Sequence, residues 1–294
     1  MVEQLGFGRR LFLGVNYAVL AALALLCLLP LIHVLAISFS SSQAATAGLV
    51  KLWPVEFTVS SYEFVLAKPA FTQSIGVSLQ RVLLGVLVNM LLTVLIAYPL
   101  AKEAKKFPYR TAYVWFFVIT MLFHGGLIPL YMTVKYTGIM NTLWALVLPN
   151  AVPVFNVVLL LNFFRGLPKE LEEAAFMDGA GHWTTLWRVM VPLSAPALAT
   201  ITLFATVGHW NAWFDGLIFM NSPDNYPLQS YLQTVVINRD LSLVSSSDLK
   251  ALAEVSDRTA KAAQIFLGAL PILLVYPFLQ RFFMKGIVLG SVKE

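Results

Sequence analysis

Charged residues are so unevenly spaced along the chain that they divide it into apolar stretches of membrane-spanning length. No Asp, Glu, Lys or Arg occurs between Arg10 and Lys51, for example. A helix of about 20 apolar residues crosses the roughly 30 Å of hydrocarbon in a lipid bilayer. Six stretches meet this requirement, and the second is interrupted by Arg81. They are residues 11–39, 75–101, 111–134, 143–164, 193–220 and 262–283.

These stretches are typical of helices rather than of the strands of a membrane β-barrel. Barrel strands alternate between lipid-facing and lumen-facing positions, whereas residues 82–95 and 154–161 are apolar without such alternation. Composition agrees, since 59% of the 294 residues are hydrophobic and 12% are charged, against about 45–50% and about 25% in soluble domains. A soluble globule and a disordered chain are therefore excluded. We expect an all-α, polytopic membrane protein with six transmembrane helices.

The Lys and Arg residues also predict the orientation of these helices. With the N-terminus in the cytoplasm, twelve basic residues fall in inner segments and seven in outer segments. Cytoplasmic loops carry an excess of Lys and Arg, and short loops weigh most. Residues 102–110 form such a short loop, with four basic residues. Both termini are therefore predicted to be cytoplasmic. The first apolar stretch is longer than the core of a signal peptide, so we expect it to remain as a helix.

The segment between the fourth and fifth stretches, residues 165–192, is longer than a connection between packed helices requires. Pro168 suits the first turn of a helix, and acidic residues follow at positions that stabilise a helix N-terminus. Asp178 and Gly179 are expected to end this helix, because Gly readily takes a positive φ. A second helix is predicted over residues 181–190. The segment thus reads as a helix, a turn and a second helix at the cytoplasmic surface.

Two segments predicted on the outer side are also long. Residues 221–261 contain two turn-rich stretches, and Asp248 is expected to cap a further helix. Four of the aromatic residues in the range 40–74 are expected at the level of the lipid headgroups. These are Trp53, Tyr62, Phe64 and Phe71.

The long cytoplasmic segment contains a motif with a known counterpart. Residues 173–180 read Glu-Ala-Ala-Phe-Met-Asp-Gly-Ala, and Val189, Val191 and Pro192 follow. This resembles the EAA loop of ABC-importer permeases, whose pattern is Glu-Ala-Ala, two residues, Asp-Gly-Ala and then a spaced aliphatic-x-Leu-Pro. Leu186 stands where the pattern has Phe, and Val191 stands where it has Leu. Both positions therefore keep an apolar side chain.

Other segments resemble the carbohydrate-uptake branch of these permeases. Residues 210–215, 226–229 and 286–294 are similar to the smaller permease subunit of maltose-type importers. Residues 123–129, Phe-His-Gly-Gly-Leu-Ile-Pro, resemble the subgroup that imports complex oligosaccharides, including uronic-acid-containing fragments of alginate or pectin. The resemblance covers nearly the whole chain, most strongly from about residue 72 onward.

The resemblance implies a single transmembrane permease domain, residues 1–294, with the type I ABC-importer fold. Core spans would cover about 72–285, an EAA coupling loop residues 165–192, and a long outer loop residues 221–261. The implied partners are a second permease subunit in a heterodimer, two cytoplasmic ATPase subunits, an extracytoplasmic solute-binding protein and an oligosaccharide substrate. The implied location is the inner membrane of a bacterium. There the basic loops behind the net charge of +5 would face membrane lipid, and no nucleic acid is expected as a partner.

In this family the coupling loop docks on the ATPase subunit, which binds ATP and Mg. This chain has no G-x-x-x-x-G-K-[ST] motif, so we expect no cofactor and no catalytic residue on it. Glu173 would contact the ATPase or hold the loop, and Gly179 would permit its sharp turn. The outer loop would reach the binding protein, and residues 286–294 the ATPase interface. The implied coupling residues are Glu173, Ala174, Ala175, Asp178, Gly179, Ala180 and Pro192.

Polar side chains within the apolar stretches are candidates for the substrate pathway, because such groups are costly in a membrane. Sugars pack on aromatic faces and bond to amides and carboxylates, and this selects Trp210, Asn211, Trp213, Asp215 and Asn156. A belt of interfacial aromatic residues is the alternative interpretation of this cluster. Arg81 is expected to extend toward the outer interface, and Asn89 to bond a neighbouring helix. Gly125 and Gly126 are expected at a close helix contact, with a gate that flexes at the glycines as the alternative.

Other classes of function have less support in the sequence. The four His residues show no ligand spacing and the single Cys27 has no partner, so we expect no metal site and no internal disulfide. An ion-coupled secondary sugar carrier is the alternative function. Such carriers usually show internal repeats and interrupted helices around midplane charges, and no repeat is evident here. An intramembrane enzyme would need a catalytic cluster, and none stands out.

Overall fold

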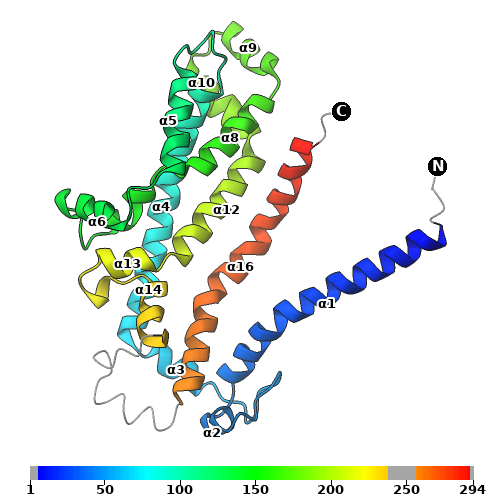
Figure 1. The fold of residues 1–294 in the computed structure, drawn as a ribbon, viewed down its shortest axis with the longest axis vertical. Coiled ribbons are helices and arrows are strands. Elements are labelled where there is room, and N and C mark those ends of the chain that lie inside the picture. Colours follow the sequence, from blue (N-terminus) through cyan, green and yellow to red (C-terminus); the bar gives the residue numbers. More distant parts are fainter. Residues whose placement is uncertain (1–5, 238–255, 292–294) are drawn as a thin grey trace. The chain divides into compact units, whose positions relative to one another are not determined.

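The computed structural model describes residues 6–237 and 256–291, and these residues form helices and no strands (Figure 1). The all-α prediction is therefore confirmed. The chain divides into two compact units. One comprises Met1–Pro69 and Thr234–Leu270, and the other comprises Ala70–Gln233 and Pro271–Glu294. The predicted cap Asp248 lies outside the described residues.

The first unit holds the N-terminal helices and the beginning of the last helix. Its elements are α1 (Phe7–Ser38), α2 (Ser42–Thr46), α3 (Ser60–Leu66) and the first part of α16 (Asp257–Ser291). A small core joins the end of α1 to α2 and α16 through buried aliphatic side chains that include Ile37, Ala45 and Ala262. Arg258 Nη1 donates to the Ala45 carbonyl over 3.0 Å, which adds a polar link between α16 and α2.

The second unit contains most of the remaining helices. In chain order they are α4 (Pro69–Ala101), α5 (Arg110–Leu122), α6 (Leu127–Tyr136), α7 (Leu143–Val147), η1 (Leu148–Asn150), α8 (Val154–Gly166), α9 (Lys169–Met177), α10 (His182–Thr185), η2 (Leu186–Met190), α11 (Val191–Leu193), α12 (Ala195–Asn211), α13 (Phe214–Phe219), η3 (Pro223–Asn225) and α14 (Leu228–Leu232). The short η4 (Gln233–Ile237) follows.

The core of this second unit lies between α4, α8 and α12, at the end where α9 and α10 attach (Figure 1). Ala97 of α4 and Leu160 of α8 are fully buried, and Ile201 of α12 is almost as well buried. Leu186 and Met190 of η2 insert into the same cluster. Burying an aliphatic side chain is worth about 1.5–3 kcal/mol. The segment after α8 is therefore fixed to the helices by its own apolar residues.

Three helices are long and apolar enough to cross a membrane by themselves, within the described part of the chain. They are α1, α4 and α16, whose qualifying segment is Asp257–Phe278. Three further pairs of helices qualify together but are bent at a short break, by 112° between α5 and α6, by 50° before α8 and by 82° before α12. By length and composition, the described residues therefore contain three candidate spans, or up to six if each bent pair is one span.

The expectation of one continuous helix over residues 111–134 is wrong. The chain leaves the helical conformation after Leu122 and resumes it at Leu127, with Gly126 at φ 90° and ψ 175°. Residues with a Cβ rarely adopt this conformation. A Cβ on Gly126 would meet nothing within 4 Å in the described part of this chain, so Gly126 serves no close contact with another helix of that part. The glycine is needed for the bend.

Two expectations for the aromatic residues in the range 40–74 need correction. Phe71 is fully buried and packs edge-on against Tyr231, with ring centroids 6.1 Å apart. Tyr62 packs on Phe39 with centroids 4.7 Å apart and exchanges a 2.7 Å hydrogen bond with Ser38. Both side chains therefore serve packing within their own unit. Trp53 remains 81% exposed, as a residue at a lipid interface would be.

Gly126→Ala tests the bend. The substitution forces a Cβ into a conformation that costs about 1–3 kcal/mol, so we expect a lower midpoint of thermal unfolding in detergent. Gly76→Ala is the matched control, because Gly76 lies within α4, has no positive φ and has room for a Cβ. Equal unfolding midpoints for the two variants would contradict the strain at Gly126.

Candidate functional site

The segment 165–192 folds as the sequence predicts. Helix α9 begins at Lys169 after Pro168 and has Glu170 and Glu172 in its first turn. At its other end, Gly179 N–H donates to the Phe176 carbonyl over 3.0 Å. Ala180 N–H donates to the Ala175 carbonyl over 2.9 Å, and Gly179 has φ 79°. These two bonds and the positive φ form a Schellman motif. The Asp-Gly-Ala part of the sequence motif is thus a helix stop.

The second half of the segment returns the chain to the core. Helix α10 starts after Gly181 and runs through a π-helical turn, η2, into α11. Leu186 and Met190 are buried in the core of the unit. Leu186 occupies the position where the family pattern has Phe, and its burial there explains why an apolar residue is required. Pro192 follows in α11, just before the 82° bend into α12.

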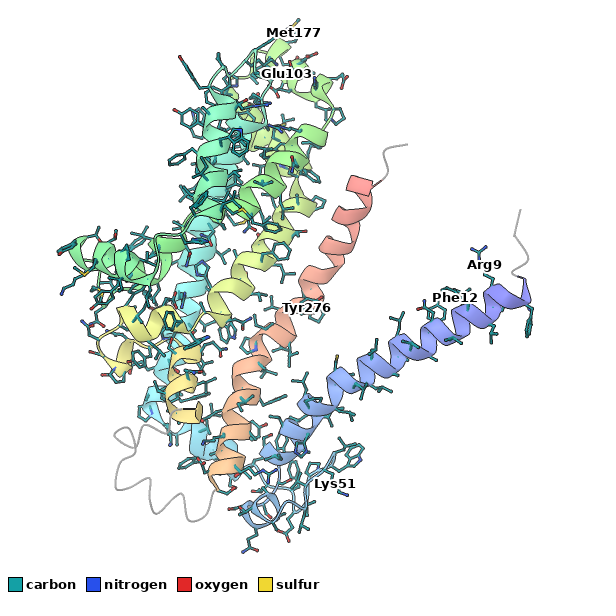
Figure 2. The ribbon with its side chains drawn as sticks, in the orientation of Figure 1. Arg9, Phe12, Lys51, Glu103, Met177 and Tyr276 are labelled. Atoms are coloured by element: carbon teal, nitrogen blue, oxygen red, sulfur yellow. The ribbon has the colours of Figure 1, made fainter. Side chains whose placement is uncertain are left out.

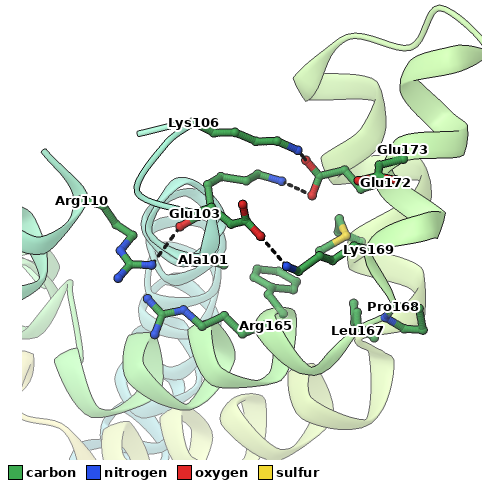
Figure 3. A pocket seen from close by; sticks show the side chains of 13 residues that line it. Ala101, Glu103, Lys106, Arg110, Arg165, Leu167, Pro168, Lys169, Glu172 and Glu173 are labelled. Carbon is green, nitrogen blue, oxygen red and sulfur yellow. Dashed lines mark hydrogen bonds and ion pairs between the residues drawn. The ribbon is translucent and has the colours of Figure 1, made fainter. Parts of the chain in front are cut away.

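The segment is also tied to the end of α4 by ion pairs (Figure 3). Lys102 Nζ lies 2.6 Å from Glu172 Oε2, and the side chains are only 10% and 15% exposed. Lys106 Nζ lies 3.9 Å from the other oxygen of Glu172. Lys169 pairs with Glu103. Helix α9 is therefore attached to the loop after α4 through Glu172, whereas Glu173, the residue singled out from the motif, is exposed.

Aromatic contacts extend this attachment into α4. The ammonium group of Lys102 lies 3.8 Å from the centre of the Tyr98 ring, within the range of a cation–π interaction. The Tyr98 hydroxyl and His182 Nδ1 are 3.5 Å apart, at the limit of a hydrogen bond. Tyr98 is buried and belongs to the core cluster. The final turn of α4 thus contacts both helices of the segment.

The two ion pairs differ in their environment. Burial lowers the pKa of Lys102, and the hydrogen bond and charge of Glu172 act against this loss. The pair from Lys169 to Glu103 is solvent-exposed. Its hydrogen bond lowers the pKa of Glu103 and raises that of Lys169. Exposed pairs contribute little because water screens them. We therefore regard Lys102 and Glu172 as the main polar link.

Large apolar side chains remain exposed on the outer surface of the segment. Met177 is 87% exposed and Trp183 is 66% exposed. Figure 2 shows Met177 at the end of the unit. Leu171 is 40% exposed. Apolar residues gathered on an exposed segment indicate a surface for another protein.

A second polar cluster lies within the helices of the same unit. Arg81 of α4 is 1% exposed and forms an ion pair with Asp215 in the first turn of α13. Its Nη1 also donates to the Ala212 carbonyl over 3.1 Å, where the chain breaks after α12. Arg81 therefore does not extend to an interface as expected. A carboxylate and a carbonyl at the break provide partners for the buried guanidinium, and both lie more than 130 residues away in the chain.

Asn89 links α4 to two other elements. Its side-chain nitrogen donates to the carbonyls of Asn150 and Ala151 over 2.8 and 2.9 Å, at the bend before α8. Its oxygen lies 2.8 Å from His209 Nε2, which must then carry the proton. A Cβ on Gly85 would overlap the His209 ring, so this glycine is needed for close approach of α4 and α12. The expectation that Asn89 bonds a neighbouring helix is confirmed.

The structure places the five pathway candidates in different environments. Trp210 is 4% exposed and Asn156 is 6% exposed. Asp215 is occupied by Arg81. Asn211 is exposed and Trp213 is 41% exposed, and both lie at the break after α12. Three of the five are thus buried or paired, and two can meet a ligand.

No group of three or more His, Cys, Asp or Glu side chains lies close enough to hold a metal ion among the residues that the structure describes.

Comparison with known proteins decides the family. Residues 74–288 match the model of the binding-protein-dependent transport system inner membrane component family. The chain belongs to this family. The matched range includes the whole segment 165–192 and both polar clusters, so these features belong to a membrane component of a transport system. The resemblance to ABC-importer permeases is therefore confirmed.

Several relatives are similar over nearly the whole chain. Protein LplC of Bacillus subtilis (strain 168) is 39% identical, over 97% of this chain and 95% of LplC. The polygalacturonan/rhamnogalacturonan transport system permease protein YtcP of the same strain is 36% identical, over 97% of this chain and 99% of YtcP. The crystal structure of a bacterial ABC transporter involved in the import of the acidic polysaccharide alginate contains a chain with 31% identity and a TM-score of 0.89. This match covers 96% of the present chain and 100% of the other. The permease fold is thus shown.

Sequence reasoning missed the residues that hold the loop. The motif identified Glu173, yet Glu172, Lys102 and Tyr98 carry the contacts. One signal was available in the sequence. Residues 102–110 form a short loop with four basic residues, and the acidic helix α9 is predicted on the same side of the membrane, so the two could be expected to pair.

Glu172→Gln tests the link between α9 and α4. Loss of the charged partner leaves the largely buried Lys102 ammonium group without its closest counter-ion, so we expect amide hydrogen exchange in α9 to rise roughly tenfold, about 1.4 kcal/mol. Glu170→Gln removes an acid from the same helical turn and controls for the helix dipole. Equal exchange rates in the two variants would show that Glu172 does not anchor the helix.

Asp215→Asn tests the buried ion pair. It leaves the deeply buried Arg81 without a counter-charge, which we expect to cost about 3 kcal/mol and to lower the yield of folded protein. The double variant Arg81→Met/Asp215→Leu removes both charges and is expected to recover most of the thermal stability. A double variant no more stable than Asp215→Asn would contradict this assignment.

Proposed function

We propose that the chain is one permease subunit of an ATP-driven, binding-protein-dependent importer of oligosaccharides, and that segment 165–192 couples it to a cytoplasmic ATPase. The attachment of this segment carries the proposal. Glu172 ties it to the end of α4, Leu186 and Met190 bury it in the core, and Met177 stays exposed. A force applied at the exposed surface would thus reach the helices without deforming the loop.

The residues of the motif have separate roles in this proposal. Glu173, Ala174 and Asp178 are exposed and would meet the ATPase, with Met177 as the apolar knob. Ala175 and Ala180 form the helix stop together with Gly179. Pro192 would hold the bend into α12. ATP and Mg would bind to the partner ATPase, and this chain would act without a cofactor of its own.

The other proposed partners follow from the family. A second permease subunit would complete the translocation pathway as a heterodimer, two ATPase subunits would bind on the cytoplasmic side, and a solute-binding protein would deliver the sugar. Both termini would lie in the cytoplasm of a bacterium, with the chain in its inner membrane. Residues 221–261 would contact the binding protein, although 238–255 lie outside the described residues. The tail 286–294 would contact the ATPase, but no side chain of the tail is described.

We propose uronate oligosaccharides as the substrate class, because the relatives named above include a polygalacturonan/rhamnogalacturonan permease and an alginate importer. Within the pathway, Trp213 and Asn211 at the break after α12 would contact the sugar. Trp210, Asn156 and Asp215 are buried or paired. They would stabilise the helices that form the pathway without contacting the sugar.

Gly179→Val tests the coupling role. The substitution strains the helix stop that presents the docking surface, so we expect ATP-dependent oligosaccharide uptake into proteoliposomes to fall roughly tenfold or more. Gly138→Val is the matched control. Gly138 also has a positive φ, 72° against 79°, and a Cβ at either residue meets nothing within 4 Å. Gly138 lies in the turn after α6, outside the coupling loop.

Unchanged uptake in Gly179→Val would contradict the coupling role. Uptake that proceeds without ATP and follows a proton gradient would instead indicate an ion-coupled carrier. The substrate class is measured separately, by comparing stimulation of ATP hydrolysis by neutral and acidic oligosaccharides.

A further inference from the structure

A cavity of about 330 Å³ lies at the end of α4, between the loop that follows it and the first turn of α9 (Figure 3). Five basic side chains and three carboxylates line it, so the lining carries a net positive charge. Two of the basic residues, Lys102 and Lys169, are paired with Glu172 and Glu103. The excess positive charge therefore comes mainly from the other basic residues.

Two arginines supply most of this excess. Arg110 Nη1 donates to the Lys102 carbonyl and Arg165 Nη2 donates to the Leu100 carbonyl, each over 3.1 Å. Neither arginine forms an ion pair within the described part of the chain. Arg110 Nε is buried and has no hydrogen-bond partner there. Each guanidinium group has five N–H donors, so most of their donors remain available.

The two guanidinium groups point toward one another at one side of the cavity (Figure 3). They are close enough for the charge of Arg110 to act unfavourably on Arg165. Binding to the C-terminal carbonyls of α4 explains why a cation lies at each position. It does not explain two adjacent like charges without a carboxylate, or a buried Nε without an acceptor. An anion between the arginines would meet both requirements.

The position of the pair favours one source of that anion. Arg110 is the first residue of α5, and Arg165 lies in the last turn of α8. Both helices are apolar, and α5 exposes large side chains that include Trp115 and Phe116. Each of them is part of a bent pair that is long enough to cross a membrane only as a pair, and a residue at the end of such a span lies at the depth of the lipid headgroups. Basic pockets at helix ends bind the headgroups of anionic lipids.

We infer that the cavity between Arg110 and Arg165 binds the phosphodiester of an anionic phospholipid. Guanidinium groups bind phosphate oxygens through paired, charge-assisted hydrogen bonds. The lipid would lie beside the Lys102–Glu172 link, at the base of the proposed coupling loop. Only its assignment to the cytoplasmic leaflet rests on the proposed function, because the site itself is made by this chain alone.

The test uses the full-length chain purified in a mild detergent, without any partner subunit. Phosphatidylglycerol is added, and the lipid that remains bound is counted by native mass spectrometry. We expect Arg110→Gln/Arg165→Gln to retain roughly tenfold less phosphatidylglycerol than the unmodified chain. Lys105→Gln/Lys135→Gln removes two positive charges outside the cavity lining and is expected to retain it fully. Phosphatidylcholine has the same phosphodiester but a cationic choline beside it, so it measures retention of a lipid without net negative charge.

Equal retention of phosphatidylglycerol by the two double variants would overturn the site. If the double arginine variant does not fold, the single variants Arg110→Gln and Arg165→Gln give the same comparison. Inorganic phosphate is then added to the lipid-bound chain. Retention in its presence supports a lipid ligand, whereas displacement by phosphate at the same concentration would show that the anion comes from solution and overturn the lipid assignment. These outcomes are independent of ATP-dependent uptake, so the lipid site and the coupling role fail separately.

Discussion

A backbone carbonyl released at a helix break needs a hydrogen-bond donor, and within apolar helices no water is present to supply one. This constraint decides where the polar side chains of the second unit lie. Arg81 donates to the carbonyl of Ala212 at the break after α12. Asn89 donates to the carbonyls of Asn150 and Ala151 at the bend before α8. The bends therefore depend on the buried polar side chains, which donate to the carbonyls that each bend leaves free.

Helix α4 carries most of these contacts. Around its middle, Arg81 and Asn89 connect it to α13, η1 and α12. In its last turns, Tyr98 and the adjoining Lys102 connect it to α9 and α10. A helix bonded in this way to breaks at one end and to the exposed loop at the other can transmit a displacement between them. In the proposed importer, this places the sugar-contacting break after α12 and the ATPase-docking surface on one rigid element.

Much of this architecture could be predicted from the sequence. Gaps between charges located the apolar helices, and the spacing of Pro168, Asp178 and Gly179 predicted the helix, turn and helix of the coupling segment. These features depend on local physics, namely helix length, capping and the conformational freedom of glycine. The motif also supplied the family, because its residues are close together in the chain.

Contacts between distant residues could not be predicted in the same way. Arg81 and Asp215 are separated by 134 positions, and neither local pattern indicates the other as a partner. Glu172 and Glu173 are adjacent and chemically alike, and only the position of α4 decides which of them is buried. The 112° bend after α5 was missed for a different reason, since the hydropathy of residues 111–134 is continuous across it.

The central claim is that α4 and the coupling segment move as one body. Spin labels at Glu170→Cys in α9 and Leu83→Cys in α4, with Cys27→Ser, test it most directly, because both labelled side chains are exposed and neither is assigned to the ATPase-docking surface. The distance between the labels is measured by electron paramagnetic resonance in the chain assembled with its ATPase partners, without and with ATP. The account predicts the same distance distribution in both states. A shift or a second population on addition of ATP would contradict it.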